Sequence, residues 1–293
     1  MSSKNRPRRS MLYMPASNPR AIEKSKLLPA DVLIFDLEDA VSPDNKIIAR
    51  GAAKNAVNSS DYGGRELLVR VNGLDTKWAE QDIKEIATSD ADGIVVPKVS
   101  SIDDIIFIES ILNDSGANED FSIWAMMETP EGVLSANTIA KASRRLMGFC
   151  VGTADLSKEL GCAHPADRSP MIMSLQMIIL AGRANELFVI DGVHMDLNDD
   201  EGYVKSCIQG KDLGFDGKTL IHPNQIKLAN DIFSPSDDEI ILSERIIDAH
   251  AKALAKGSGV ITLDGKLIEV LHVEQAKNLL KKAASIRLLE NEF

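Results

Sequence analysis

Two apolar runs in the middle of the chain each end in a single carboxylate. Glu128 directly follows the run at residues 123–127, and Asp155 lies three residues beyond the run at 146–152. Apolar runs of this length that stop abruptly are typical of buried parallel strands. Carboxylates at the ends of two neighbouring strands can together bind one hard cation such as Mg²⁺. Each carboxylate could instead cap the helix that follows it.

Further polar and charged residues occupy the same position, near the end of an apolar run. They are Asp36, Glu38, Asp39, Arg70, Lys98, Asp191 and His222. Because an isolated buried charge is costly, charges repeated at one end of successive strands indicate a shared functional site. The guanidinium group of Arg70 can bind a carboxylate through two parallel hydrogen bonds.

The acidic residues of this group have more than one possible role. Asp36, Glu38 and Asp39 either orient metal-bound water, orient Arg70, or form a loop that caps a helix. For Lys98 we expect a structural ion pair with Glu38 or Asp39.

Eight short apolar runs alternate with helix-like segments over the first 233 residues. The runs lie at residues 11–15, 32–39, 67–72, 93–98, 123–127, 146–152, 188–193 and 217–222. Strict alternation predicts a parallel sheet, and eight such units predict a closed (β/α)₈ barrel, also called a TIM barrel. An open sheet is less favoured because no glycine-rich dinucleotide fingerprint follows the first run.

In such a barrel the active site forms at the carboxyl ends of the strands, where these residues are expected to lie. At this rim we expect Asp191 to shape a turn. His222 either contacts a substrate or fills the mouth of the barrel. After Asp155 we expect an irregular stretch that leads to a long helix at residues 170–186.

The chain is expected to divide into a barrel domain, residues 1–233, and a C-terminal segment, residues 234–293. Within that segment the pattern predicts an amphipathic helix, a chain break, a hairpin with an Asp-Gly turn, and a final helix. These lie at residues 236–256, 257–259, 260–269 and from 273 onward. A segment that the barrel does not need is expected to act as a lid or an oligomerisation arm.

Bulk composition excludes several classes of protein. The 293 residues carry a net charge of −11, which disfavours nucleic acid as a partner. No apolar stretch reaches membrane-spanning length, and Cys150, Cys162 and Cys207 lack metal-ligand spacing. We expect free thiols in a reducing cytoplasm. The basic residues 1–9 are expected to form a solvated tail, or alternatively a clamp for a phosphate-bearing ligand.

A divalent cation beside an arginine suits an α-keto or α-hydroxy acid. The metal ion can bind one carboxylate oxygen and the adjacent oxygen, while the arginine binds the rest of the carboxylate. Such a site also stabilises the enolate that forms when a carbon–carbon bond breaks. Since no Cys–His or Ser–His pairing is visible, the residues indicate aldol- or Claisen-type lyase chemistry.

Short motifs throughout the chain carry a family resemblance. They are Arg9–Pro15, Phe35–Val41, Val69–Asn72, Pro97–Lys98, Glu128–Thr129, Gly152–Asp155, Ile190–Val193, Gly214–Lys218 and His222–Pro223. In their order and spacing the chain resembles citrate lyase β-subunit-like proteins, which are grouped with malyl-CoA and citramalyl-CoA lyases in the HpcH/HpaI aldolase superfamily.

The resemblance implies an activity and its cofactor. It implies Mg²⁺ bound by Glu128 and Asp155, with Mn²⁺ as a substitute, and a substrate carboxylate bound by Arg70. The implied reaction cleaves a 3-hydroxyacyl-CoA, such as malyl-CoA or citramalyl-CoA, to acetyl-CoA and an α-keto acid, or runs in reverse. The implied assembly is a homotrimer or hexamer in which the C-terminal segment covers a neighbour's site.

The candidate site residues follow from both lines of reasoning. Those expected to be catalytic are Arg70, Glu269, Asp36, Glu38, Asp39 and Lys98. Those expected to bind the acyl-CoA or keto acid are Arg70, Glu128, Thr153, Ala154, Asp155, His222, Pro223 and Arg9. Many relatives have aspartate, the lid's acid/base, where Glu269 stands, and Asp264 is a weaker substitute. Many also have glutamate at the position of Ala154.

Three other functions remain open at this stage. The first is a citrate lyase β subunit that acts on an acyl-carrier protein and releases oxaloacetate. The Asp191-Gly192 pair looks more like the malyl- and citramalyl-CoA lyases, which favours a free CoA thioester. The second is a malyl-CoA thioesterase, in which water attacks the thioester. The third is a non-catalytic barrel, which the intact rim of charged residues disfavours.

Overall fold

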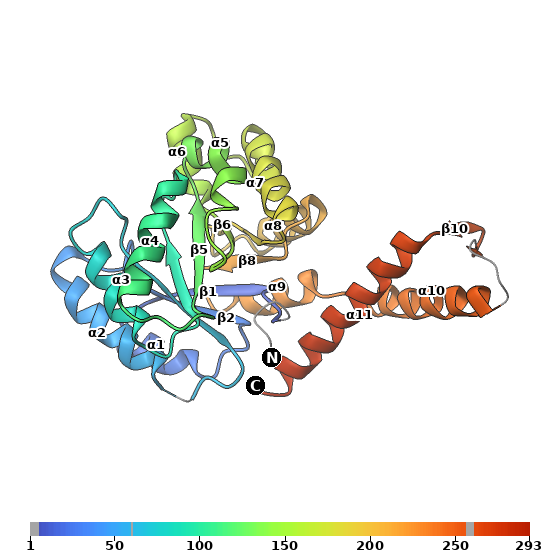
Figure 1. Cartoon of the computed structure of the whole chain (residues 1–293), viewed down its shortest axis with the longest axis horizontal. Helices are drawn as coiled ribbons and strands as arrows, with labels where there is room; N and C mark the ends of the chain where they lie inside the picture. Colours follow the sequence, from blue (N-terminus) through green and yellow to red (C-terminus); the bar gives the residue numbers. More distant parts are fainter. Residues whose placement is uncertain (1–5, 60, 256–260) are drawn as a thin grey trace. The chain divides into compact units, whose positions relative to one another are not determined.

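The computed structural model of the chain describes residues 6–59, 61–255 and 261–293. Within these residues, eight parallel strands pair in sequence order, and the last pairs with the first, so the sheet closes into a barrel (Figure 1). The strands are β1 (Ser10–Pro15), β2 (Val32–Asp36), β3 (Glu66–Arg70), β4 (Gly93–Val96), β5 (Ser122–Met127), β6 (Leu146–Val151), β7 (Phe188–Asp191) and β8 (Gly217–Leu220). The predicted (β/α)₈ barrel is confirmed.

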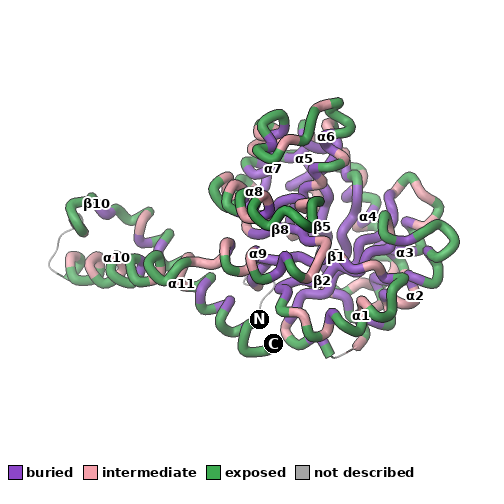
Figure 2. Tube along the Cα trace, turned by 180° about the vertical axis from the view of Figure 1, so that it is seen from behind, coloured by how far each residue is buried: buried purple, intermediate pink, exposed green. Residues whose placement is uncertain are grey.

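Helices follow the strands and cover the outside of the barrel (Figure 2). They are α1 (Pro19–Ser25), α2 (Lys46–Val57), α3 (Ala79–Ala87), α4 (Ile102–Asp114), α5 (Pro130–Ile139), α6 (Thr153–Leu160), α7 (Ile172–Ala184), α8 (Asp200–Leu213) and α9 (Gln225–Phe233). Two of them differ from expectation. Helix α6 covers residues where an irregular stretch was expected, and α8 was not predicted because its residues show no clear apolar pattern. Asp155 therefore lies in the first turn of a helix.

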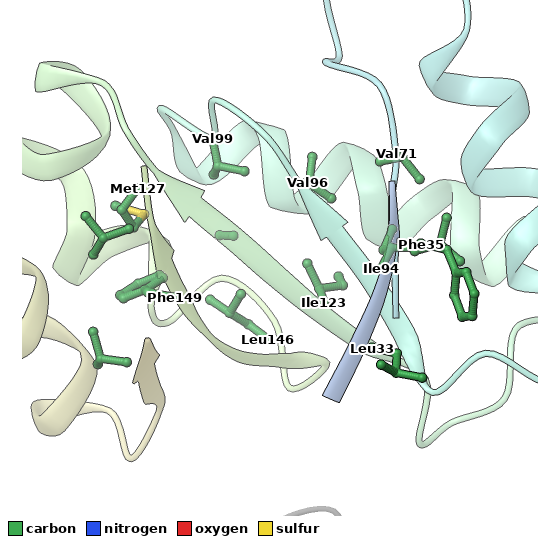
Figure 3. Close-up of a cluster of buried hydrophobic side chains, with 14 of the residues drawn as sticks. Leu33, Phe35, Val71, Ile94, Val96, Val99, Ile123, Met127, Leu146 and Phe149 are labelled. Atoms are coloured by element: carbon green, nitrogen blue, oxygen red, sulfur yellow. The ribbon is translucent and has the colours of Figure 1, made fainter. Parts of the chain in front are cut away.

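Alternation along the strands decides which side chains enter the barrel. Ile34, Leu68, Met126 and Ile190 belong to a small buried cluster inside the barrel. Their sequence neighbours instead form a larger cluster with the helices, part of which Figure 3 shows. Because side chains alternate between the two faces of a strand, residues two positions beyond these inward side chains also point inward, at the carboxyl end.

Arginines close the amino end of the barrel. The buried Arg8 side chain forms an ion pair with Glu66, with Nε 2.6 Å from Oε2. The Arg8 guanidinium also lies 4.3 Å from the centroid of the Phe188 ring and 5.2 Å from that of Trp124. The neighbouring Arg9 pairs with Asp31 through Nε at 2.9 Å and Nη2 at 2.8 Å. These contacts leave both arginines buried at the end opposite the expected site.

The C-terminal residues form a second compact unit. It contains α10 (Asp237–Ala255), a hairpin of β9 (Ile261–Leu263) and β10 (Lys266–Ile268), and α11 (Val270–Glu290), and α10 packs against α11. The turn at Asp264 and Gly265 has φ angles of 51° and 77°, as an Asp-Gly hairpin turn requires. Asp264 also pairs with Arg245 of α10 at 2.8 Å.

Some expectations fall on residues outside the described ranges. They are the basic residues 1–5, the end of the helix at Lys256, the chain break at 257–259 and the first residue of the hairpin at 260. Among the described helices, none is long and apolar enough to cross a membrane.

Closure of the barrel makes Gly217 hard to replace. A Cβ atom added there would lie 1.8 Å from the backbone oxygen of Arg8, whereas one added at Gly51 in α2 would meet nothing within 4 Å. We expect Gly217→Ala to lower the free energy of unfolding by about 2 kcal/mol or more, as overpacking does. Gly51→Ala should raise it by about 0.5–1 kcal/mol, because alanine favours the helix. Urea unfolding of both variants measures the difference, and equal stabilities would contradict this account of closure.

Candidate active site

A cavity of about 360 Å³ opens at the carboxyl ends of the strands. It brings together most of the residues that the sequence indicated. Its lining includes Asp36, Asp39, Arg70, Glu128, Thr153, Ala154 and Asp155, together with Tyr13 and Thr219. Asp36 and Arg70 end β2 and β3, and Glu128 directly follows β5. Each lies two positions beyond a side chain of the inner cluster, so strand alternation explains why they meet.

Arg70 is clamped by the acidic residues beside it. Its Nε and Nη2 atoms each lie 2.7 Å from one oxygen of Asp36, and Nη1 lies 2.9 Å from Oε2 of Glu38. A weaker contact of 3.5 Å joins Nη1 to Asp39, and the ring centroid of Tyr13 lies 4.7 Å from the guanidinium carbon. A side chain held on several sides is pre-oriented for a ligand carboxylate, which would share the remaining N–H groups.

The loop that carries these acidic residues is itself fixed by hydrogen bonds. The carboxylate of Asp36 accepts the backbone N–H groups of Glu38 and Ala40. From α2, the ammonium group of Lys46 donates to the backbone oxygens of Leu37 at 2.8 Å and Glu38 at 2.7 Å. Sequence reasoning missed Lys46, because a lysine at the start of a helix shows no sign of which distant carbonyls it will contact.

Glu128 is almost fully buried beside a glycine. Its Oε1 atom accepts the backbone N–H of Lys98 at 2.8 Å, and Lys98 adopts a left-handed backbone conformation with φ 55°. A Cβ atom added at Gly152 would lie 2.1 Å from Oε2 of Glu128, so only glycine leaves room for this carboxylate. Since Thr129 caps α5 by accepting the N–H of Gly132, Glu128 is not needed as a helix cap.

Burial raises the pKa of two carboxyl groups at this site, those of Glu128 and Glu38. It raises the pKa of Glu128 to about 8, and the charge of Glu38 adds to the effect, while the Lys98 N–H opposes it. Burial likewise raises the pKa of Glu38 to about 7 against the lowering influence of Arg70. A buried carboxylate without a cationic partner is costly, so the ionised Glu128 favours the arrival of a cation.

The donor atoms fit a hard divalent cation. Glu128 and Asp155 line the same cavity, and the charge of Asp155 contributes to the raised pKa of Glu128. Asp155 also lies near the positive end of α6, where a carboxylate is stabilised. No cluster of three or more His, Cys, Asp or Glu side chains suited to a metal occurs among the described residues. Two carboxylates with open positions for water and substrate are a common Mg²⁺ arrangement.

Lys98 differs from the expectation of an ion pair. Its side chain is exposed, and within the described ranges it forms no salt bridge, since Glu38 pairs with Arg70 instead. The side chain borders an adjoining hollow that Glu38, Asp39 and Trp78 also line. Burial lowers the pKa of Lys98, but the carboxylates of Glu38 and its neighbours outweigh that and raise it.

Three of the residues expected to bind substrate lie outside the lining of this cavity. Arg9 was expected to bind substrate, but it precedes β1 and is buried against Asp31 at the opposite end of the barrel. His222 and Pro223 are not among the residues that line the cavity. The Nδ1 atom of His222 accepts the N–H of Asn224 at 3.2 Å, and the ring borders a separate small hollow.

Asp191 and Glu269 are not among the residues that line this cavity. Asp191 follows the inward-facing Ile190, and its carboxylate is buried against Gly210 of α8 rather than lining the cavity. It pairs there with Arg168 at 2.5 Å and Lys218 at 2.8 Å. Glu269, in the second unit, caps α11 in a reciprocal capping box with His272. Its predicted part in catalysis stays a prediction.

The fold and the cavity together define a class of protein. It is a TIM-barrel protein with an acidic, arginine-containing cavity at the end where enzymes of this fold have their active sites. The sequence model of one family, described as HpcH/HpaI aldolase/citrate lyase, matches residues 9–223. The chain belongs to this family.

Comparison with individual proteins agrees with this placement. The chain is 46% identical over 286 residues to a (3S)-malyl-CoA thioesterase of Cereibacter sphaeroides, covering 98% of each protein. It is 34% identical to the citrate lyase subunit beta of Escherichia coli K12, over 96% of this chain and 94% of that protein. A solved structure of CitE from Mycobacterium tuberculosis, in complex with magnesium, acetoacetate and coenzyme A, superposes with a TM-score of 0.77. That protein is 26% identical, with 94% of this chain and 97% of that chain covered.

The raised pKa values of Glu128 and Glu38 predict how stability depends on pH. Between pH 4.5 and about 8, Glu128 keeps its proton in the folded protein but loses it in the unfolded chain. For Glu38 the same holds between pH 4.5 and about 7. Stability of the metal-free protein should therefore fall as pH rises through this window, by at most about 1.4 kcal/mol per pH unit for each group. Urea unfolding in EDTA at pH 5.5, 7 and 8.5 measures the slope.

Two variants test whether Glu128 causes this dependence of stability on pH. Glu128→Gln should make it shallower, because the amide cannot ionise. Glu131→Gln, at an exposed position of α5, should leave it unchanged. A slope that Glu128→Gln does not alter would show that Glu128 titrates normally.

The contacts of Lys46 predict that it holds the Arg70 clamp in place. Lys46→Met would leave the oxygens of Leu37 and Glu38 without their donor, so we expect a loss of about 1–3 kcal/mol in unfolding free energy. Amide hydrogen exchange at Glu38 and Ala40 should become faster. Lys84→Met, at an exposed position in α3, is the control and should change stability by under about 0.5 kcal/mol. Unchanged exchange at both amides would show that Lys46 does not hold this loop.

Proposed function

We propose that the protein is a Mg²⁺-dependent carbon–carbon lyase that acts on a 3-hydroxyacyl-CoA such as malyl-CoA or citramalyl-CoA. The products are acetyl-CoA and an α-keto acid, glyoxylate or pyruvate, and the same site would catalyse the reverse condensation. The observation that carries the proposal is the clamped Arg70 in one cavity with Glu128 and Asp155. The M. tuberculosis structure with magnesium, acetoacetate and coenzyme A supports both the metal and a substrate that carries coenzyme A.

Each group in the cavity has a role in this reaction. Glu128 and Asp155 would hold the Mg²⁺ ion, with Mn²⁺ as a substitute, and the bound ion would neutralise negative charge that develops on the substrate oxygen. Arg70 would bind the carboxylate next to the reacting carbon and keep it in line for bond cleavage. Asp36, Glu38 and Asp39 would hold Arg70, while Thr153 and Ala154 would contact the substrate beside Asp155.

The reaction also needs two proton transfers. In the cleavage direction a base removes the proton of the 3-hydroxyl group, and an acid then protonates the terminal carbon of the acetyl group. We assign this acid/base role to the carboxylate of Glu269. Its side chain is one methylene longer than aspartate, and proton transfer depends on reach, so the assignment needs its own test with Glu269→Gln and Glu269→Asp.

We also propose how the chain is organised for this function. Residues 1–233 would form the catalytic barrel domain. Residues 234–293 would act as a lid or oligomerisation segment within a cytoplasmic homotrimer or hexamer. The exposed Leu254, Leu271 and Leu288 of α10 and α11 support an interface on this segment.

Two alternatives rest on particular relatives. The alignment with the thioesterase of C. sphaeroides covers 98% of this chain, which supports a malyl-CoA thioesterase as a second candidate. In that case water attacks the thioester carbonyl and free malate and CoA are released. The E. coli protein supports a citrate lyase β subunit, which would act on an acyl-carrier protein and release oxaloacetate.

A product assay separates these functions. Purified protein would be incubated with malyl-CoA, citramalyl-CoA and citryl-CoA, in Mg²⁺ or in EDTA, and keto acid, acetyl-CoA, free hydroxy acid and free CoA would be quantified. We expect EDTA-sensitive release of a keto acid together with equal acetyl-CoA. Free malate and CoA without glyoxylate would identify the thioesterase. No turnover of any free thioester, with turnover of a carrier-bound one, would identify the citrate lyase subunit.

Matched substitutions test the metal site within the same assay. Glu128→Gln should lower kcat/KM by about 100-fold or more, because loss of a metal ligand removes several kcal/mol of transition-state stabilisation. Glu131→Gln should retain normal activity. Full Mg²⁺-dependent cleavage by the Glu128→Gln protein would disprove the assigned ligand.

A further inference from the structure

The side chain of Tyr13 reaches across the inside of the barrel. Tyr13 lies on β1, two positions beyond Met11 of the inner cluster, so strand alternation points it inward. Its hydroxyl group lies 3.8 Å from Sδ of Met126 on β5. In the closed sheet β1 and β5 are four strands apart in either direction, so this contact joins opposite walls. The interior of an eight-stranded barrel is narrow enough for side chains to fill it in this way.

This side chain forms the floor of the catalytic cavity. It packs against the apolar side chains of the inner cluster, which include Ile34 and Cys150. The same residue lines the cavity, together with Arg70 and Glu128. Tyr13 therefore separates the polar cavity from the apolar interior of the barrel, and a ligand that fills the cavity rests against it.

The two ends of the Tyr13 side chain lie beside the two groups that a keto acid would bridge. The ring centroid is 4.7 Å from the guanidinium carbon of Arg70. The hydroxyl end contacts Met126, which lies two positions before Glu128 on the same face of its strand. A carboxylate shared between Arg70 and a cation at Glu128 would lie along the same line, within reach of the hydroxyl group.

The hydroxyl group of Tyr13 has its hydrogen-bonding capacity largely unused. Its acceptor is the thioether sulfur of Met126, and thioether sulfur is a weak acceptor. Within the described ranges, no oxygen or nitrogen atom forms a hydrogen bond with this hydroxyl group. Burial raises the pKa of Tyr13 well above the usual value for tyrosine, against the lowering influence of Arg70. The group thus keeps its proton and is available as a donor to a ligand oxygen.

We propose that the hydroxyl group of Tyr13 donates a hydrogen bond to the carboxylate of the bound keto acid, in addition to the contact from Arg70. This carboxylate keeps its charge while the carbon–carbon bond breaks or forms. The hydrogen bond therefore stabilises the ground state and the transition state alike, and it strengthens binding of the keto acid without changing the chemical step. This inference rests on the proposed function.

Tyr13→Phe tests the hydroxyl group, because it keeps an aromatic ring against Arg70. Condensation with acetyl-CoA would be measured with glyoxylate and with pyruvate. We expect KM for the keto acid to rise about tenfold, the usual order for a lost hydrogen bond to a charged group. The kcat value and KM for acetyl-CoA should change by less than about twofold, as loss of uniform binding predicts.

Tyr62→Phe is the matched control for loss of a tyrosine hydroxyl. Tyr62 packs edge to face against Phe35, in the cluster between the strands and the helices, so this substitution should change neither KM nor kcat. If Tyr13→Phe left KM for both keto acids unchanged, Tyr13 would serve only to pack against Arg70, and the inference would be overturned. A fall in kcat at constant KM would also overturn it, because the hydroxyl group would then act on the reacting oxygen.

Calorimetry separates this inference from the proposed function. If the wild-type protein condenses neither keto acid, the proposed function fails, and oxalate in the presence of Mg²⁺ then serves as the probe of the cavity. Oxalate has two adjacent oxygen donors, as an α-keto acid has. Binding of oxalate that Tyr13→Phe weakens about fivefold or more, and that Tyr62→Phe leaves unchanged, supports the assigned hydrogen bond. Equal binding by the wild-type and Tyr13→Phe proteins, or no binding by the wild type, refutes it.

Discussion

The ion pair between Asp36 and Arg70 is the interaction on which the site depends. The two residues are direct neighbours in the register of β2 and β3, so closure of the barrel places them in contact. Their pairing neutralises one buried carboxylate, but the site holds more carboxylates than cations. Glu38 shares the guanidinium of Arg70, and Glu128 accepts only a backbone N–H. A cavity with more buried carboxylates than cations gains stability from a bound cation. The surplus of negative charge that would favour a cation at this site thus follows from the way the strands pair.

Much of the fold and of the site follows from local patterns. Apolar runs located the eight strands, and the order of charged residues at their ends located Asp36, Arg70 and Glu128, because a parallel barrel gathers the ends of its strands. The patterns failed where helical periodicity was weak. Helix α8 mixes charged and small residues, and α6 is a short helix that begins at the site itself.

The predicted residues that do not line the cavity show the limit of local patterns. Arg9 precedes its strand rather than following it, and that position alone assigns it to the amino end. His222 follows β8 as Glu128 follows β5, but the His222 ring accepts a hydrogen bond from the backbone of Asn224 and does not line the cavity. The contact of Lys46 with Glu38 joins residues 8 apart, and that of Arg168 with Asp191 joins residues 23 apart, which no local pattern encodes.

The closing contact of the barrel has a consequence for how the chain is made. The backbone N–H of Lys218 donates to the oxygen of Arg9, so β1 meets its last partner only after more than two hundred further residues have been added. A ribosome that adds about 5–20 residues per second needs roughly 10–40 s for that stretch. During this interval one edge of β1 has no partner strand. An unpaired edge can pair with other chains, so we expect newly made protein to need a chaperone until β8 emerges.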